Sequence, residues 1–81
     1  MELAWRPNET GHARLGLIVP RFQYTAVARN RLRRRLREIV RRGPLAHLPA
    51  VDLVVRANRA AYAAPFAVLR AELAAGVSRI T

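Results

Sequence analysis

Hydrophobic and polar residues are arranged in three short stretches that predict β-strands. Residues 2–8 alternate loosely, and residues 14–20 place apolar side chains at every second position. A turn signal over residues 8–12 separates these two stretches, so we expect them to pair as a hairpin. The third stretch, residues 51–55, is almost continuously apolar, which is typical of a strand covered on both faces.

Two further stretches repeat every three to four residues and predict amphipathic helices. The first covers residues 26–42, with Thr25 as its N-cap and Gly43-Pro44 as its stop signal. The second begins at Pro65, which takes its first position. The apolar residues of the first helix lie within about a third of its circumference: Ala28, Leu32, Leu36, Ile39 and Val40. Those of the second recur at a spacing of three or four residues: Phe66, Leu69, Leu73, Val77 and Ile80. The β-β-α-β-α order predicts an α+β fold, a two-layer sandwich in which residues 1–81 form a single domain with both helices on one sheet face.

The charge of the chain is concentrated on the first predicted helix. All fifteen basic residues are arginine and five residues are acidic, so the net charge is +10. Residues 25–42 hold eight of these arginines and one acid, Glu38, and therefore carry +7. Such a cluster is typical of a surface that binds a polyanion through its phosphates. Two alternatives stay open: a solvated charged helix face, and a basic amphipathic helix lying on an anionic membrane.

Composition narrows the remaining classes of function. The chain has no cysteine and no apolar run of the ~20 residues that cross a bilayer, so we expect a cytoplasmic protein without membrane contact. The carboxylates are dispersed and the histidines, His12 and His47, are solitary, so we expect no catalytic side chain and no metal site in the protein. Aromatic residues that could stack on bases are Phe22, Tyr24 and Tyr62, whereas Trp5 is expected in the core. Phe22 and Tyr24 follow a strand end and could equally cap the core.

Two runs resemble the bacterial ribonuclease P protein subunit, an RNA-binding family. They are Arg14-Leu-Gly-Leu-Ile-Val-Pro-Arg21 and Ala26-Val-Ala-Arg-Asn-Arg-Leu-Arg-Arg-Arg-Leu-Arg-Glu38. The resemblance implies a fold like domain 2 of ribosomal protein S5, with a left-handed βαβ crossover around the basic helix. It implies as partners the catalytic RNA of ribonuclease P and precursor tRNA, whose 5′ leader this RNA-catalysed endoribonuclease removes. The Mg²⁺ that hydrolysis requires would be held by the RNA and not by the protein.

The resemblance also assigns residues by position. Those implied to face the catalytic RNA are Arg29, Asn30, Arg31, Arg33, Arg34, Arg37 and Arg41, and those implied on the leader side are Arg21, Phe22 and Arg59. The family begins with a helix and a strand that precede the matched region. We therefore expect a sheet that is one strand short, with an uncovered edge that allows weak self-association. The alternative function is a non-enzymatic RNA-binding or ribosome-associated module that keeps the docking helix but not leader recognition.

Overall fold

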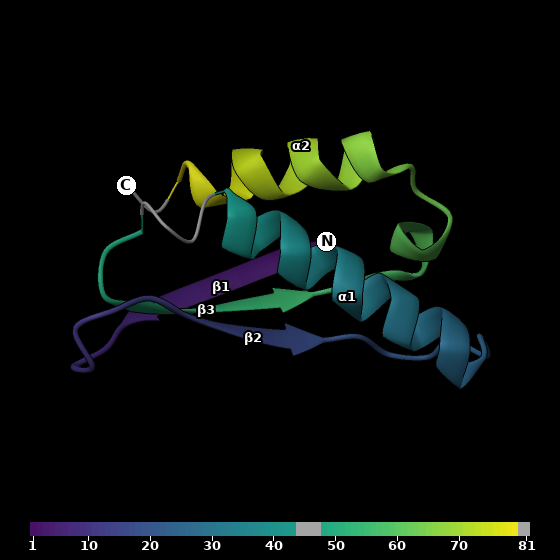
Figure 1. Cartoon of the computed structure of the whole chain (residues 1–81), viewed down its shortest axis with the longest axis horizontal. Helices are drawn as coiled ribbons and strands as arrows, with labels where there is room; N and C mark the ends of the chain where they lie inside the picture. The colour runs from purple at the N-terminus through teal and green to yellow at the C-terminus, as the bar shows by residue number, and fades with distance from the viewer. Residues whose placement is uncertain (44–47, 80–81) are drawn as a thin grey trace.

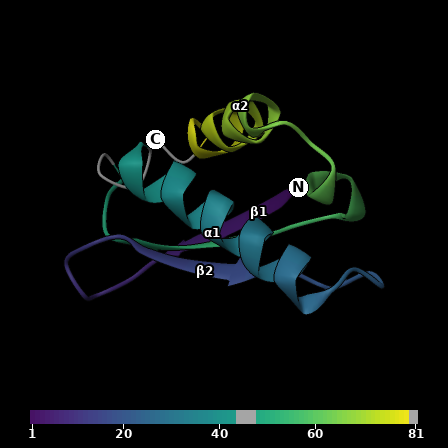
Figure 2. The same cartoon turned by 45° about the vertical axis from the view of Figure 1, so that its right-hand side comes forward.

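The chain folds into two layers, a β-sheet and a pair of helices that cover one of its faces (Figure 1). The computed structural model describes residues 1–43 and 48–79. Over these residues the elements are β1 (Glu2–Pro7), β2 (Arg14–Ile18), α1 (Ala26–Arg42), β3 (Val51–Arg56), the 3₁₀-helix η2 (Arg59–Tyr62) and α2 (Phe66–Val77). The predicted α+β class and β-β-α-β-α order are confirmed. Figure 2 shows α1 and α2 on the same side of the sheet from a second direction.

The order of the strands differs from the predicted hairpin. β3 lies in the centre, antiparallel to β1 and parallel to β2, so that Leu53 has Trp5 on one side and Leu15 on the other. The hairpin prediction was wrong because β2, α1 and β3 form a parallel crossover, which brings the most apolar strand between the other two. The turn after β1 instead reaches β3, where the Asn8 amide donates to the Ala50 carbonyl over 3.0 Å.

The core lies between the sheet and the two helices. Its fully buried side chains include Leu36 of α1, Leu53 and Val55 of β3, and Leu69 and Leu73 of α2. Burial alternates along β3, where the residues between the buried ones are only half-buried on the open face of the sheet. The prediction that this strand is covered on both faces was therefore wrong, since both helices lie on one side.

The ends of α1 follow the sequence signals closely. The Thr25 hydroxyl accepts a hydrogen bond from the Ala28 amide over 3.1 Å, as expected of an N-cap. The helix ends at Gly43, which has a φ of −123° and not the positive φ of a typical C-terminal glycine. A Cβ there would lie 3.3 Å from the Ile39 carbonyl oxygen, so close approach accounts for the glycine. Pro44 and His47 lie outside the described residues.

Two aromatic residues that were expected in the core are exposed. Trp5 is 47% and Phe66 is 45% exposed. Trp5 does share a face with Leu3, but β1 is an edge strand, and α2 packs closely against it at Leu3. This approach depends on Gly76, because a Cβ there would lie 2.7 Å from the Leu3 Cδ2 atom. Ile80, also expected in the core, lies outside the described residues.

The described helices can be compared with the two ways in which a helix contacts a membrane, by crossing it or by lying on its surface. None of them is long and apolar enough to cross a bilayer. The apolar side of α1, with Leu32, Leu36 and Ile39, is buried against the rest of the chain. That side is therefore unavailable to lie on a membrane while the domain is folded, which speaks against the anionic-membrane alternative.

Candidate nucleic-acid interface

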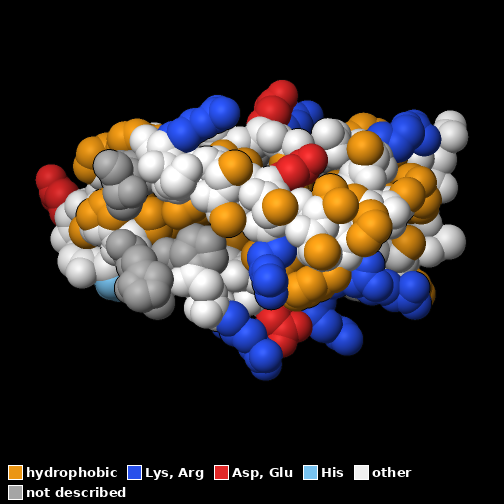
Figure 3. Space-filling model, turned by 90° about the horizontal axis from the view of Figure 1, so that it is seen from above, with side chains coloured by type: hydrophobic (Ala, Val, Ile, Leu, Met, Phe, Trp, Pro, Cys, Tyr) orange, Lys and Arg blue, Asp and Glu red, His pale blue; other side chains and the backbone are white. Residues whose placement is uncertain are grey.

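The solvent side of α1 is strongly basic and has very little opposing charge. Its residues make one ion pair within the described part of the chain, between Arg42 and Glu38 at 2.9 Å. Seen from above the helices, basic side chains gather along the edge that α1 forms, whereas hydrophobic and neutral side chains dominate the surface over α2 (Figure 3). Most of the charge predicted for this helix is thus exposed, and acidic side chains of the described residues neutralise little of it.

One flank of α1 brings together four of the predicted RNA-facing residues. Asn30, Arg33, Arg34 and Arg37 line a surface hollow of about 340 Å³. Three of them are exposed and Arg33 is half-buried. Arg41, one turn beyond Arg37, is also exposed. Four guanidinium groups along two successive turns can contact several phosphates of one RNA backbone, because each forms paired hydrogen bonds with phosphate oxygens.

Arg29 is placed differently from the other arginines of the predicted set. It is half-buried, and its Nε donates to the Val19 carbonyl over 2.8 Å. This bond ties the first turn of α1 to the backbone just after β2. Arg29 therefore positions the helix as well as contributing charge, a role that the sequence motif did not reveal.

Arg31 is exposed on the opposite flank of α1 and belongs to a second hollow. This hollow, of about 250 Å³, is lined by Arg31 and by residues outside the predicted RNA-facing set, namely Tyr24, Ala28, Leu32, Arg35 and Tyr62. The predicted RNA-facing residues are thus divided between two flanks of the helix.

The predicted leader-side residues lie in the loop before α1 and at η2. The Arg59 guanidinium carbon is 5.3 Å from the centre of the Phe22 ring, in the range of a cation–π contact. Arg21 donates through Nε to the Tyr24 carbonyl over 3.3 Å, within its own loop. Phe22 and Gln23 have positive φ angles of 48° and 71°, which non-glycine residues rarely adopt. The structure thus brings Phe22 and Arg59 together, while Arg21 stabilises the loop.

The open face of the sheet carries a charged row that the sequence analysis missed. Arg6, Asp52 and Arg14 are aligned across β1, β3 and β2. Arg14 donates two hydrogen bonds to the Asp52 carboxylate, over 2.7 and 2.9 Å, and Asn8 donates a third over 3.0 Å. The bonds from Arg14 are the main cause that lowers the pKa of Asp52 to about 2. No sequence spacing signals this pairing, since Arg14 and Asp52 meet only through the parallel register.

The next row of the open face is small and apolar. It consists of Ala4, Val54 and Gly16, and the row beyond it holds Glu2, Arg56 and Ile18. Glu2 and Arg56 also line a further hollow at this end of the sheet, together with Phe22 and Asn58. The apolar row thus lies between two rows that each hold acidic and basic side chains.

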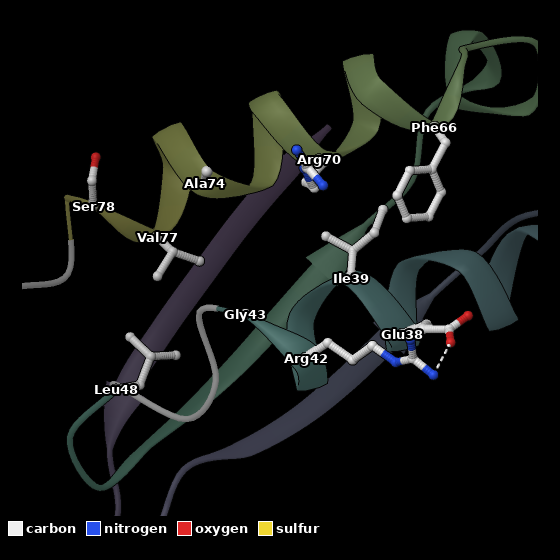
Figure 4. Close-up of a pocket in the computed structure, with 10 residues that line it drawn as sticks. All are labelled: Glu38, Ile39, Arg42, Gly43, Leu48, Phe66, Arg70, Ala74, Val77 and Ser78. Carbon is white, nitrogen blue, oxygen red and sulfur yellow. Dashed lines mark ion pairs between the residues drawn. The ribbon is translucent and has the colours of Figure 1, made fainter.

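A larger groove between α1 and α2 is apolar (Figure 4). It has a volume of about 760 Å³; Ile39, Val77 and Phe66 point into it, and Arg42 and Arg70 lie along its rim. Gly43 and Leu48 also line it, and they flank residues outside the described part of the chain.

The chain is thus a small basic α+β protein in which an arginine-rich helix packs on a mixed β-sheet. The family model described as Ribonuclease P matches residues 1–81. The chain belongs to the ribonuclease P protein family.

Two curated relatives illustrate the similarity in sequence. The chain is 40% identical over 73 residues to the ribonuclease P protein component of Thermus scotoductus, covering 90% of this chain and 42% of that protein. It is 51% identical over 67 residues to the one from Acidothermus cellulolyticus, covering 82% of this chain and 55% of that protein. The chain thus spans about half the length of these relatives.

Solved structures of the family share the fold. The RNase P protein from Thermotoga maritima superimposes with a TM-score of 0.84 at 30% identity, over 98% of this chain and 78% of that one. The Staphylococcus aureus RNase P protein gives a TM-score of 0.82 at 27% identity, over 94% of this chain and 70% of that one. The family that residues 14–38 resemble is therefore confirmed, and the similarity covers the whole chain.

Proposed function

We propose that this chain acts as the protein subunit of ribonuclease P, docking on the catalytic RNA through α1 and assisting 5′-leader removal from precursor tRNA in the cytoplasm. The observation that carries the proposal is the exposed flank of Asn30, Arg33, Arg34 and Arg37, whose charge no described acidic side chain balances. The family assignment supports an RNA partner within a ribonucleoprotein.

Docking would proceed through phosphate contacts and counterion release. Each arginine that neutralises a phosphate steepens the salt dependence of binding, by roughly 0.7 to 0.9 in the slope of log K against log salt. Structured RNA is A-form, so the α1 surface would follow backbone and 2′-hydroxyl groups and would not read base edges in the narrow major groove.

The leader would lie along the open face of the sheet. Ala4 and Gly16 have little side-chain bulk on either side of Val54, so an extended strand would lie along this row, and Phe22 with Arg59 lies near the Arg56 end of the sheet. The Mg²⁺ would be held by the RNA. The chain would then position RNA groups and would not supply a nucleophile or a base.

Cleavage of precursor tRNA by a bacterial ribonuclease P RNA at low Mg²⁺, with and without this chain, tests the proposal. We expect the chain to raise the cleavage rate. The double variant Arg34→Ala with Arg37→Ala should weaken RNA binding and make the salt slope shallower by about 1.4 to 1.8. Arg70→Ala, an exposed arginine of α2, is the matched control and should leave both unchanged. Absence of any stimulation by the unaltered chain would overturn the proposal.

A leader comparison separates the main proposal from its alternative. If the chain binds RNA tightly but gains no affinity when a leader is added to the tRNA, it acts as an RNA-binding or ribosome-associated module.

The outer strands of the sheet are β1 and β2, and we propose that the chain associates weakly with itself through one of these edges. Sedimentation of the free chain over a concentration series measures it.

A further inference from the structure

Tyr24 and Tyr62 form a stacked pair beside α1. Their ring centres are 4.1 Å apart and the ring planes differ by only 2°. Tyr62 is half-buried, while Tyr24 is 36% exposed. The pair thus reaches from the half-buried Tyr62 to Tyr24 at the surface.

The surroundings of the pair hold it in place. The Tyr62 hydroxyl donates to the Pro20 carbonyl over 2.6 Å, and Phe22 packs edge-on against the Tyr62 ring at 6.4 Å. The Tyr24 amide donates to the Arg21 carbonyl over 2.7 Å. A platform fixed before binding loses little side-chain entropy when a ligand stacks on it.

The hollow next to this pair is basic. Arg31 and Arg35 are exposed one turn apart on α1, and with Tyr24 and Tyr62 they line the space of about 250 Å³ described above. Its remaining lining residues are apolar, and no acidic residue lines it. Arg35 lies outside the set of residues that the resemblance implies to face the catalytic RNA.

We propose that this hollow binds one unpaired nucleotide of an RNA, with its base stacked on Tyr24 and a neighbouring phosphate held by Arg31 and Arg35. A flat aromatic platform with cations at its rim suits a single-stranded nucleotide, because a paired base has both its faces covered by neighbours. The inference rests on the proposed RNA-binding function and adds to it a second contact, on the flank of α1 opposite the hollow of Arg33 and Arg34.

Short oligoribonucleotides test this contact directly. We compare a uridine octamer with an otherwise identical octamer whose central residues are abasic, and with an RNA duplex of equal length. The full chain should bind the uridine octamer roughly tenfold more tightly than the abasic one. In Tyr24→Leu this advantage should disappear, whereas Tyr24→Phe, which keeps the ring, should retain it.

Controls separate a lost contact from a lost fold. Phe66→Leu removes an exposed ring from α2 and should leave the base-dependent advantage intact, and thermal unfolding verifies that each variant is folded. Arg35→Gln should weaken binding of both octamers alike, since it removes a phosphate contact. The inference would be overturned if the unaltered chain bound the uridine and abasic octamers with equal affinity. It would also be overturned if folded Tyr24→Leu kept the higher affinity for the uridine octamer.

Two longer RNAs identify the source of the nucleotide and keep the two proposals distinguishable. Binding of Tyr24→Leu to ribonuclease P RNA and to leader-bearing precursor tRNA shows which of them loses affinity, and a loss for either supports the inference. Normal stimulation of cleavage together with no effect of Tyr24→Leu on any RNA would refute this contact alone. Failure of the unaltered chain to stimulate cleavage, with the base-dependent octamer binding retained, would refute only the proposed function.

Discussion

Replacing Arg29 by alanine should destabilise the fold, whereas replacing its exposed neighbour Arg34 should not. Both residues belong to the set that the family motif assigns to RNA. Only Arg29 also donates a hydrogen bond into the protein, from Nε to the Val19 carbonyl over 2.8 Å. Both changes remove one charge from α1 and exchange arginine for the same helix-forming residue, so intrinsic helix propensity affects the two variants alike.

The expected size of the effect follows from that bond. A hydrogen bond to a charged group contributes about 1.5 to 3 kcal/mol net. Because Arg29 is only half-buried and solvent screens part of this interaction, we reduce this to about 1 to 2 kcal/mol. For a domain of this size each 1 kcal/mol changes Tm by about 4 to 8 °C, so Arg29→Ala should lower Tm by about 5 to 15 °C. Arg34→Ala should change the free energy of unfolding by no more than about 0.5 kcal/mol.

Thermal unfolding followed by circular dichroism, with RNA affinity measured in parallel below both midpoints, checks this difference. A third variant, Arg29→Lys, keeps the charge but not the guanidinium fork, so it should lose stability while retaining more of the RNA affinity. Equal Tm values for Arg29→Ala and Arg34→Ala would show that the bond to Val19 contributes nothing to stability, and the positioning role of Arg29 would have to be abandoned.

Three further variants test the core, the open sheet face and the start of α1. Leu36→Ala should cost about 2 to 5 kcal/mol, measured by urea unfolding, because Leu36 is fully buried. Arg14 is the main cause that lowers the pKa of Asp52 from 3.8 to about 2. The contribution of ionised Asp52 to the free energy of unfolding should therefore be fully present above about pH 4 and be lost as the pH falls to about 2. Asp52→Asn should remove this part of the pH dependence. Thr25→Ala should cost about 1 kcal/mol and Thr25→Ser very little, because only the hydroxyl caps the Ala28 amide. An acid profile of Asp52→Asn equal to that of the unaltered chain would contradict the second expectation.

Local signals in the sequence located the elements well. The cap at Thr25 and the apolar period that follows it predict α1 with its observed bounds, Ala26–Arg42. Pro65, predicted as the first residue of α2, is instead its N-cap, and the helix covers Phe66–Val77. These features depend on residues close together in the chain, where capping, period and stop signals act directly on the backbone. The short η2 helix was missed, although Asn58 caps it by accepting from the Ala61 amide over 3.1 Å.

Contacts between distant segments could not be predicted in the same way. The turn after β1 suggested a hairpin, but nothing local to β1 and β2 indicates that β3 will separate them. The exposure of Trp5 follows from that topology, because an edge strand receives cover only where α2 reaches it. The Arg14–Asp52 pair and the Tyr24–Tyr62 stack also join residues 38 apart in sequence, so each becomes visible only when the register of the strands and the path of the loops are known.

The two faces of α1 are linked through the stability of the domain. Four pairs of arginines stand four residues apart along the helix, namely 29 with 33, 31 with 35, 33 with 37, and 37 with 41. Each like-charged pair of this spacing costs about 0.2 to 0.5 kcal/mol, together about 1 to 2 kcal/mol. Burial of Leu32, Leu36, Ile39 and Val40 on the other face offsets this cost, but an 81-residue domain has only about 4 to 12 kcal/mol of stability in total. A bound polyanion removes the repulsion while leaving the core unchanged, so the arrangement that makes α1 unfavourable in the free chain favours binding to RNA.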